Sequence, residues 1–161
     1  MIAFRFGGSA AADESPGVKD VTPISLAGRW TGSYYGYGRS RDGQDCGDSG
    51  CRMMFDIVAC KDGWCGIAVK TDKSCGAVGL HLAADAKAGE KVFDGQLELA
   101  KGAAPYVVQA WHNTDKETGI TEMHFVGDTG TKLLMIRRSY PFEATLTRAG
   151  DATCTLDKAT S

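Results

Sequence analysis

The sequence predicts an all-β fold: an antiparallel up-and-down barrel of about eight or nine strands, with at most one short helix, stapled by disulfide bonds. Short runs rich in valine, isoleucine, tyrosine, phenylalanine and threonine recur along the chain, which is typical of strands. The 161 residues include 21 glycines and only 4 prolines, and this balance suits many tight turns. The 6 cysteines, an even number in a small chain, favour disulfide bonds.

The chain divides into a leader and one domain. Residues 1–23 are small, polar and unpatterned, and we interpret them as a flexible leader or signal remnant. Ser9–Asp13 reads SAAAD, like the small-residue end of a secretory signal, but the charged and apolar segments that precede such an end are missing. A plain disordered tail is the alternative. Residues 24–161 are expected to form a single β-barrel domain, since this length supports one packed core.

Nine strands are expected in this domain, with turns rich in glycine and aspartate between them. They are Gly28–Tyr37, Met53–Cys60, Trp64–Lys70, Ala77–Leu82, Val92–Leu99, Tyr106–His112, Ile120–Val126, Lys132–Arg137 and Phe142–Arg148. The only plausible short helix is Leu80–Glu90. Closure into a barrel removes exposed sheet edges, and about eight strands leave room inside for side chains or one small ligand.

Alternation of side-chain character supports individual strands. Along residues 93–99, phenylalanine and leucine alternate with aspartate, glutamine and glutamate. Ile67 and Val69 alternate with small or polar residues, and Phe55 and Ile57 flank Asp56. A period of two predicts one buried face and one wet face, so Asp56 is expected on the wet face.

The cysteine spacing suggests a framework of three bonds. Residues 60 and 65 flank a short turn, and in a hairpin they would be close enough to bond. The favoured pairing, one of several that six cysteines allow, is Cys46 with Cys51, Cys60 with Cys65, and Cys75 with Cys154. The alternative is zinc, held by four thiolates of two C-x4-C pairs. An exported chain would oxidise those thiols first.

No catalytic residue is predicted. Gly47–Gly50 reads GDSG, like the sequence around the nucleophile of chymotrypsin-like proteases. All three histidines, His81, His112 and His124, lie downstream of it, in no matching context. A serine without a base and an orienting acid is not activated, so Ser49 is interpreted as part of a disulfide-closed turn. We therefore expect a protein without enzymatic activity and without a cofactor.

No metal site is predicted either. Asp42, Asp45 and Asp48 form a D-x2-D-x2-D run in a glycine-rich loop, and their oxygens suit calcium. The spacing is not the alternating pattern of an EF-hand, so a solvated loop is the favoured interpretation. The histidines have no ligand spacing.

Charge and hydropathy exclude some classes of partner. The net charge of −2 offers no attraction to a polyanion, which disfavours nucleic acid. No apolar run approaches the ~18 residues that a membrane span requires. A small-molecule ligand or a protein of the cell envelope remains as the expected partner.

Two short motifs carry a family resemblance. Leu26–Trp30 reads LAGRW, a G-x-W at the start of the first strand, and Ala144–Arg148 (ATLTR) closes the last strand with an arginine. This layout resembles the calycin-like barrels of the lipocalin and avidin type, and most of all small exported proteins of proteobacteria. The resemblance implies that Trp30 plugs one end and that Arg148 packs over it, since a guanidinium gains cation–π energy on an indole. The biotin site of avidins and the remaining lipocalin signatures are not recognisable.

These observations predict a non-catalytic binding protein, periplasmic or secreted, that takes a small molecule or an envelope component at its mouth or interior. The candidate ligand-binding residues are aromatic, with a plain core role as their alternative; they are Tyr35, Tyr37, Trp64, Tyr106 and Trp111.

The alternative function is protein interaction, as a periplasmic protease inhibitor or an accessory subunit of an envelope complex. Calycin-like inhibitors begin with a similar L-A-G-x-W and insert an N-terminal trunk into the protease cleft. Here the leader before Leu26 would take that part.

Overall fold

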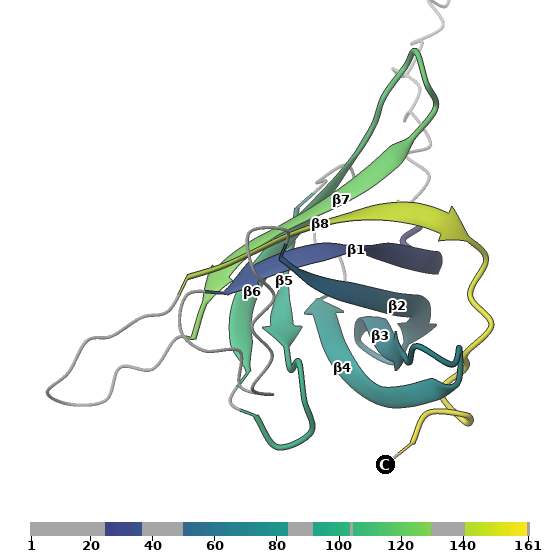
Figure 1. Ribbon diagram of the computed structural model, residues 1–161, viewed down its shortest axis with the longest axis vertical. Coiled ribbons are helices and arrows are strands. Elements are labelled where there is room, and N and C mark those ends of the chain that lie inside the picture. Colours follow the sequence, from purple (N-terminus) through teal and green to yellow (C-terminus); the bar gives the residue numbers. More distant parts are fainter. Residues whose placement is uncertain (1–24, 37–49, 84–91, 104, 130–140, 161) are drawn as a thin grey trace, which may run out of the picture.

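Eight antiparallel strands form a closed barrel in the computed structural model, which describes residues 25–36, 50–83, 92–103, 105–129 and 141–160 (Figure 1). Each strand pairs with the next along the chain, and the last pairs with the first. The strands are β1 (Gly28–Gly36), β2 (Cys51–Cys60), β3 (Gly63–Val69), β4 (Cys75–Ala83), β5 (Val92–Leu97), β6 (Tyr106–Thr114), β7 (Thr121–Asp128) and β8 (Pro141–Gly150).

The predicted all-β, antiparallel, up-and-down architecture is confirmed. Eight of the expected strands match β1 to β8 to within a few residues, and the ninth, at 132–137, lies outside the described residues. The first part of the expected helix Leu80–Glu90 is wrong, because Leu80–Ala83 continue β4. Leu80 and Leu82 are buried and pair with β5, so their period of two prevails over the weak helical pattern. The remainder of that segment lies outside the described residues. Within the described ranges, no helix is long and apolar enough to cross a membrane.

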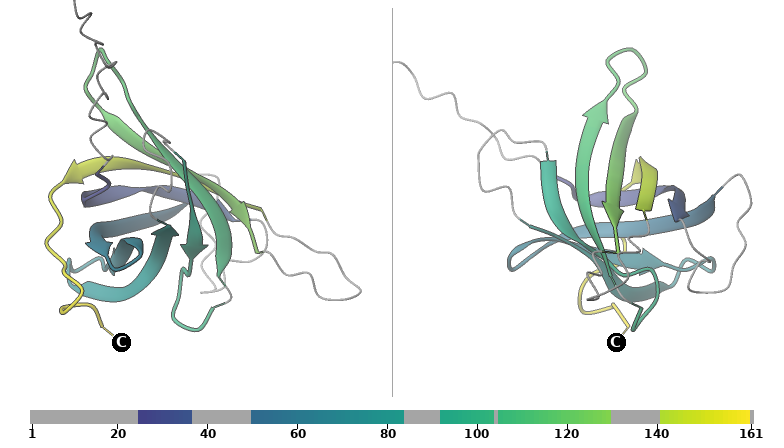
Figure 2. Two further views of the ribbon diagram at one scale, coloured as in Figure 1. Left: turned by 180° about the vertical axis from the view of Figure 1, so that it is seen from behind. Right: turned by 90° about the vertical axis from the view of Figure 1, so that its left-hand side faces the viewer.

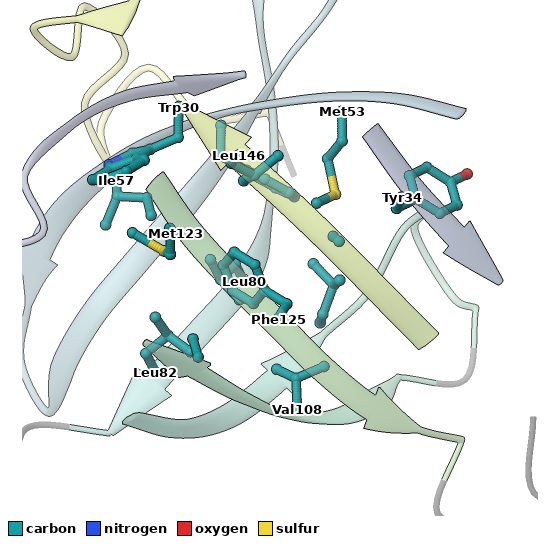
Figure 3. Close-up of a cluster of buried hydrophobic side chains, with 14 of the residues drawn as sticks. Trp30, Tyr34, Met53, Ile57, Leu80, Leu82, Val108, Met123, Phe125 and Leu146 are labelled. Atoms are coloured by element: carbon teal, nitrogen blue, oxygen red, sulfur yellow. The ribbon is translucent and has the colours of Figure 1, made fainter. Parts of the chain in front are cut away.

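Side chains fill the barrel interior (Figure 3). Every strand except β3 contributes fully buried or nearly buried apolar residues to this main core, and β3 contributes Trp64 and Ala68, which are partly buried. The largest fully buried members include Trp30, Phe125, Ile57, Leu80, Leu97, Met123 and Leu146. The interior of the barrel is therefore a packed core, as expected for a small barrel of eight strands.

A second, smaller core lies outside the barrel wall. Ile67, Val69 and Cys154 are buried there, against partly buried residues of β2, β4 and the C-terminal segment. Residues 151–160 follow β8 and run back past β3 and β4, and the Thr160 N–H donates to the Gly76 carbonyl at 2.9 Å (Figures 1 and 2). The alternation predicted for β3 is therefore present in the structure. Its apolar face, Ile67 and Val69, points away from the barrel interior and is covered by residues 151–160.

Asp56 is not on a wet face, contrary to the expectation from alternation, because the same tail buries it. Its side chain has no exposed surface and pairs with Arg29, with Nε to Oδ1 at 2.7 Å and Nη2 to Oδ2 at 2.8 Å. The backbone N–H groups of Thr153 and Cys154 donate to Oδ2 at 2.8 and 2.7 Å. A buried carboxylate with this many donors is satisfied, and it fastens the tail to β1 and β2.

Two of the three predicted disulfide bonds are confirmed, Cys60–Cys65 and Cys75–Cys154. Cys51 is also disulfide-bonded, and Cys46, its predicted partner, lies outside the described residues. None of the cysteines in the described part of the chain is free, so the thiolates that the zinc alternative requires are not available there.

Candidate functional site

At one end of the barrel, which we call the tyrosine end, lie the aromatic rings of Tyr34, Tyr106 and Phe142. Tyr34 lies near the end of β1, while Tyr106 and Phe142 lie at the start of β6 and β8. The up-and-down topology brings these three positions to the same rim. The ring centroids of Tyr34 and Phe142 are 5.7 Å apart, and those of Tyr106 and Phe142 are 4.8 Å apart. Such pairs stabilise one another beyond the area that they bury.

The rings reach across the mouth of the barrel. The Tyr106 hydroxyl lies 3.3 Å from the position that a Cβ of Gly36 would occupy, although β6 and β1 are not neighbours in the sheet. Figure 3 shows the Tyr34 ring at one edge of the core cluster, with its oxygen directed away from the labelled apolar side chains. Phe142 is buried, whereas Tyr106 is only partly buried. The tyrosine end therefore combines an apolar floor with two phenol hydroxyls, one of which belongs to a half-buried ring.

The opposite end is sealed. Trp30 is buried, and its Nε1 donates to the Leu26 carbonyl at 2.9 Å. Trp30 and Arg148 are cross-strand partners in the β1–β8 register. Arg148 donates from Nη2 to the Ala27 carbonyl at 3.4 Å and to Asp151 Oδ1 at 3.2 Å. Packing of this guanidinium on the Trp30 ring stays a prediction.

Of the five aromatic residues expected to bind a ligand, the four that the structure describes do not converge. Tyr106 is at the tyrosine end, whereas Trp64 follows the β2–β3 turn at the sealed end and packs against the main core. Tyr35 and Trp111 lie on the outer face of the barrel, since their strand neighbours Tyr34 and Ala110 point inward. Tyr37 lies outside the described residues.

The outer face of β5 to β8 carries the other notable cluster. Trp111 on β6 stacks with its cross-strand partner His124 on β7, with ring centroids 5.6 Å apart. His124 contacts Thr145 of β8 through Nδ1 at 3.3 Å and Glu122 through Nε2 at 3.6 Å. Three exposed valines lie on the same outer face: Val92 (48% exposed), which is the cross-strand partner of Trp111, and Val107 (54%) and Val126 (39%), whose cross-strand partners are polar. We call these residues the outer valine face.

Two residues that matter were missed from the sequence. Tyr34 follows Trp30 and Gly32 at intervals of two, so the same alternation that buries Trp30 also directs Tyr34 inward. Phe142 alternates in the same way with the buried Ala144 and Leu146. Only the closed topology puts Tyr34 and Phe142 beside Tyr106, which comes from the middle of the chain.

No metal centre is apparent in the described ranges, where no group of three or more potential ligands converges. Asp42, Asp45, Asp48 and Ser49 lie outside those ranges.

Comparison with known proteins adds no relative: no family model matches the chain, and no curated protein or solved structure is detectably similar to it.

Proposed function

We propose that the protein is a non-catalytic binding protein that takes an amphipathic small molecule, or part of a cell-envelope component, at the tyrosine end. The observation that carries this proposal is the set of three rings spanning the mouth, with the half-buried Tyr106 reaching from β6 toward β1. An apolar floor with a few placed polar groups is typical of small-molecule sites.

Because side chains fill the barrel interior, a ligand would bind at the tyrosine end rather than at the centre. A ligand at the barrel centre would have to displace fully buried side chains such as Phe125 and Leu80, and opening space in a packed core costs several kcal/mol, about 2–5 for each large side chain lost from contact. Tyr106 is only partly buried, so fewer packing contacts are lost if its ring moves. The ligand's apolar part would therefore rest on Phe142 and its polar part would meet the tyrosine hydroxyls.

An oxidising compartment, periplasmic or extracellular, is part of the proposal. This part of the proposal is supported by the described cysteines, which are all disulfide-bonded, since disulfide bonds seldom persist in a reducing cytosol.

Native mass spectrometry of the protein isolated from its own host tests the proposal. We expect a non-covalently bound small molecule that is lost from Tyr106→Ala but retained by Val107→Thr, the adjacent position on the outer face. Tyr106→Phe should show an intermediate loss, because it keeps the ring and removes the hydroxyl. Equal occupancy in Tyr106→Ala, or no bound species in the unaltered protein, would overturn the proposal.

The outer valine face favours a second candidate function, the binding of a partner protein. The tail covers the outer face of β2 to β4, whereas Val92, Val107 and Val126 stay exposed on β5 to β7. Three exposed valines and the stacked Trp111 on one outer face support an interaction surface there. Crosslinking in the host distinguishes the two functions: a captured protein lost from Val107→Asp but kept by Tyr106→Ala supports this second candidate.

A further inference from the structure

The β2–β3 hairpin carries a disulfide bond whose two cysteines are unequally exposed. Cys65 lies on β3 and is only 5% exposed, whereas Cys60 ends β2 and is half-buried. The next residues, Lys61 and Asp62, form the exposed turn. Cys60 is therefore the more accessible of the two residues to a reagent in solvent.

A histidine lies beside the less exposed sulfur. His81 of β4 is the cross-strand partner of Cys65, and its Nδ1 is 3.4 Å from Cys65 Sγ. An imidazole N–H at this position can donate to a thiolate, and a neighbouring imidazolium stabilises the thiolate charge. Because His81 is itself exposed, protons can exchange with solvent.

The second disulfide provides a contrast within the same molecule. Cys154 has no exposed surface and is enclosed in the second core with Ile67 and Val69. Cys75 is half-buried, as Cys60 is, but it packs against this second core, whereas Cys60 is not among the residues of either core. Attack by a thiolate requires access to a sulfur, so we expect the Cys75–Cys154 bond to react more slowly than the Cys60–Cys65 bond.

We propose that Cys60–Cys65 is a thiol-exchange site, at which small-molecule thiols attack Cys60 and His81 stabilises Cys65 as the leaving thiolate. This inference is independent of ligand binding at the tyrosine end, because the hairpin lies at the sealed end of the barrel.

The exchange has two balanced steps. A small-molecule thiolate forms a bond to Cys60 Sγ, and the Cys60–Cys65 bond breaks with its electron pair leaving on Cys65, which takes a proton through His81. A second thiolate then attacks the mixed disulfide at the small-molecule sulfur, releases the oxidised small-molecule disulfide and leaves Cys60 as a thiolate, which takes a proton from solvent. Two external thiols are oxidised, and the protein gains two electrons and two protons.

Opening this bond leaves the barrel intact. The ring from Cys60 to Cys65 is short, and β2 and β3 stay paired by their backbone along Phe55–Cys60. A long loop loses more chain entropy on closure than a short one, so the barrel depends less on this bond than on Cys75–Cys154. The exchange is therefore compatible with a folded protein.

Reduction by glutathione, quenched with an alkylating reagent and mapped by peptide mass spectrometry, tests the proposal on the full chain. We expect Cys60 and Cys65 to be labelled first, a mixed disulfide on Cys60, and an intact Cys75–Cys154 bond. His81→Phe should slow the labelling on the order of tenfold, whereas His124→Phe, a matched change of a histidine on the outer face, should not.

Three results would overturn the proposal: reduction of Cys75–Cys154 at an equal or greater rate, a mixed disulfide found on Cys65, or an unchanged rate in His81→Phe. The first two are measured on the unaltered protein, so they remain decisive if the His81 variant does not fold.

Discussion

At the scale of single residues, Asp56 links the tail to the barrel. Burial by itself raises the pKa of this carboxyl, but the hydrogen bond from Arg29 and those from the backbone N–H groups of Cys154 and Thr153 outweigh it, so the pKa lies below the usual range. A lowered pKa in the folded state means that the carboxylate stabilises the fold above the unfolded pKa of about 4 and loses this effect as pH falls through the folded value.

Asp56→Asn is expected to lower the free energy of unfolding at pH 7 by about 3 kcal/mol, because it leaves Arg29 without its buried counter-charge. Urea unfolding at pH 7 and at pH values below 4 measures this, and the difference between variant and parent should shrink in acid. Asp94→Asn, an exposed carboxylate that accepts from Gln109, is the control and should change stability by less than about 0.5 kcal/mol. A constant difference across this pH range would contradict the assignment.

At the scale of elements, close contacts between strands require particular glycines. A Cβ on Gly32 of β1 would lie 2.0 Å from the Thr145 carbonyl oxygen of β8. A Cβ on Gly95 would lie 2.0 Å from the His81 carbonyl oxygen, and one on Gly127 would lie 2.1 Å from the Val107 carbonyl oxygen. These glycines let strands coil tightly around a small core, a role that glycine often has in strongly curved sheets.

Gly32→Ala is expected to destabilise the barrel by about 3 kcal/mol, because β1 and β8 must separate to admit the methyl group. Gly36→Ala, on the same strand, is the control: its methyl would meet only the Tyr106 hydroxyl at 3.3 Å, at the end of a side chain. Thermal unfolding followed by circular dichroism measures both, and equal melting temperatures would contradict the steric argument.

The two disulfide bonds are expected to contribute unequally to stability. Loop closure gives about 2 kcal/mol for the short ring at Cys60–Cys65 and about 4.5 kcal/mol for the long one at Cys75–Cys154, as upper values. Replacing Cys75 and Cys154 by alanine should therefore lower the melting temperature more than replacing Cys60 and Cys65. The reverse order would show that the tail is held mainly by contacts other than this bond.

At the scale of the whole molecule, the barrel has one covered side and one exposed side. Residues 151–160 cover the outer face of β2 to β4 through the second core, the Asp56 contacts and a disulfide bond. The β6–β7 hairpin projects away from the rest of the barrel (Figure 2). Among the described residues, Val92, Val107 and Val126 stay exposed on the outer face of β5 to β7.

Truncation after Gly150 should expose Ile67 and Val69 and leave Asp56 paired with Arg29 alone. We expect a folded but less stable barrel that binds a hydrophobic dye, since the main core does not include the tail. Dye fluorescence and the melting temperature measure the effect. A truncated chain with unchanged dye binding and stability would show that the tail is not part of the fold.

The sequence by itself determined the strands, their antiparallel up-and-down order and the Cys60–Cys65 pair, because a period of two and the spacing of these two cysteines are local properties. The confirmed Cys75–Cys154 pair, 79 residues apart, was predicted only as the pair that remained. The sequence did not determine whether the apolar face of a strand packs inside the barrel or is covered from outside. Ile67 and Asp56 show the reason: the C-terminal tail helps to bury both, with Thr153 and Cys154 97 and 98 positions from Asp56, and no local pattern shows what will cover a strand.

The grouping of the three rings at the tyrosine end likewise depends on the tertiary structure. Tyr34, Tyr106 and Phe142 are separate aromatic residues in the sequence, and only closure of the barrel through the β1–β8 pairing gathers them at one rim. Alternation predicts that a side chain points inward, but the position along the barrel axis where it meets others depends on the register of every strand between them. A site built from distant strands is therefore a property of the closed sheet, because long-range pairing sets the registers on which it depends.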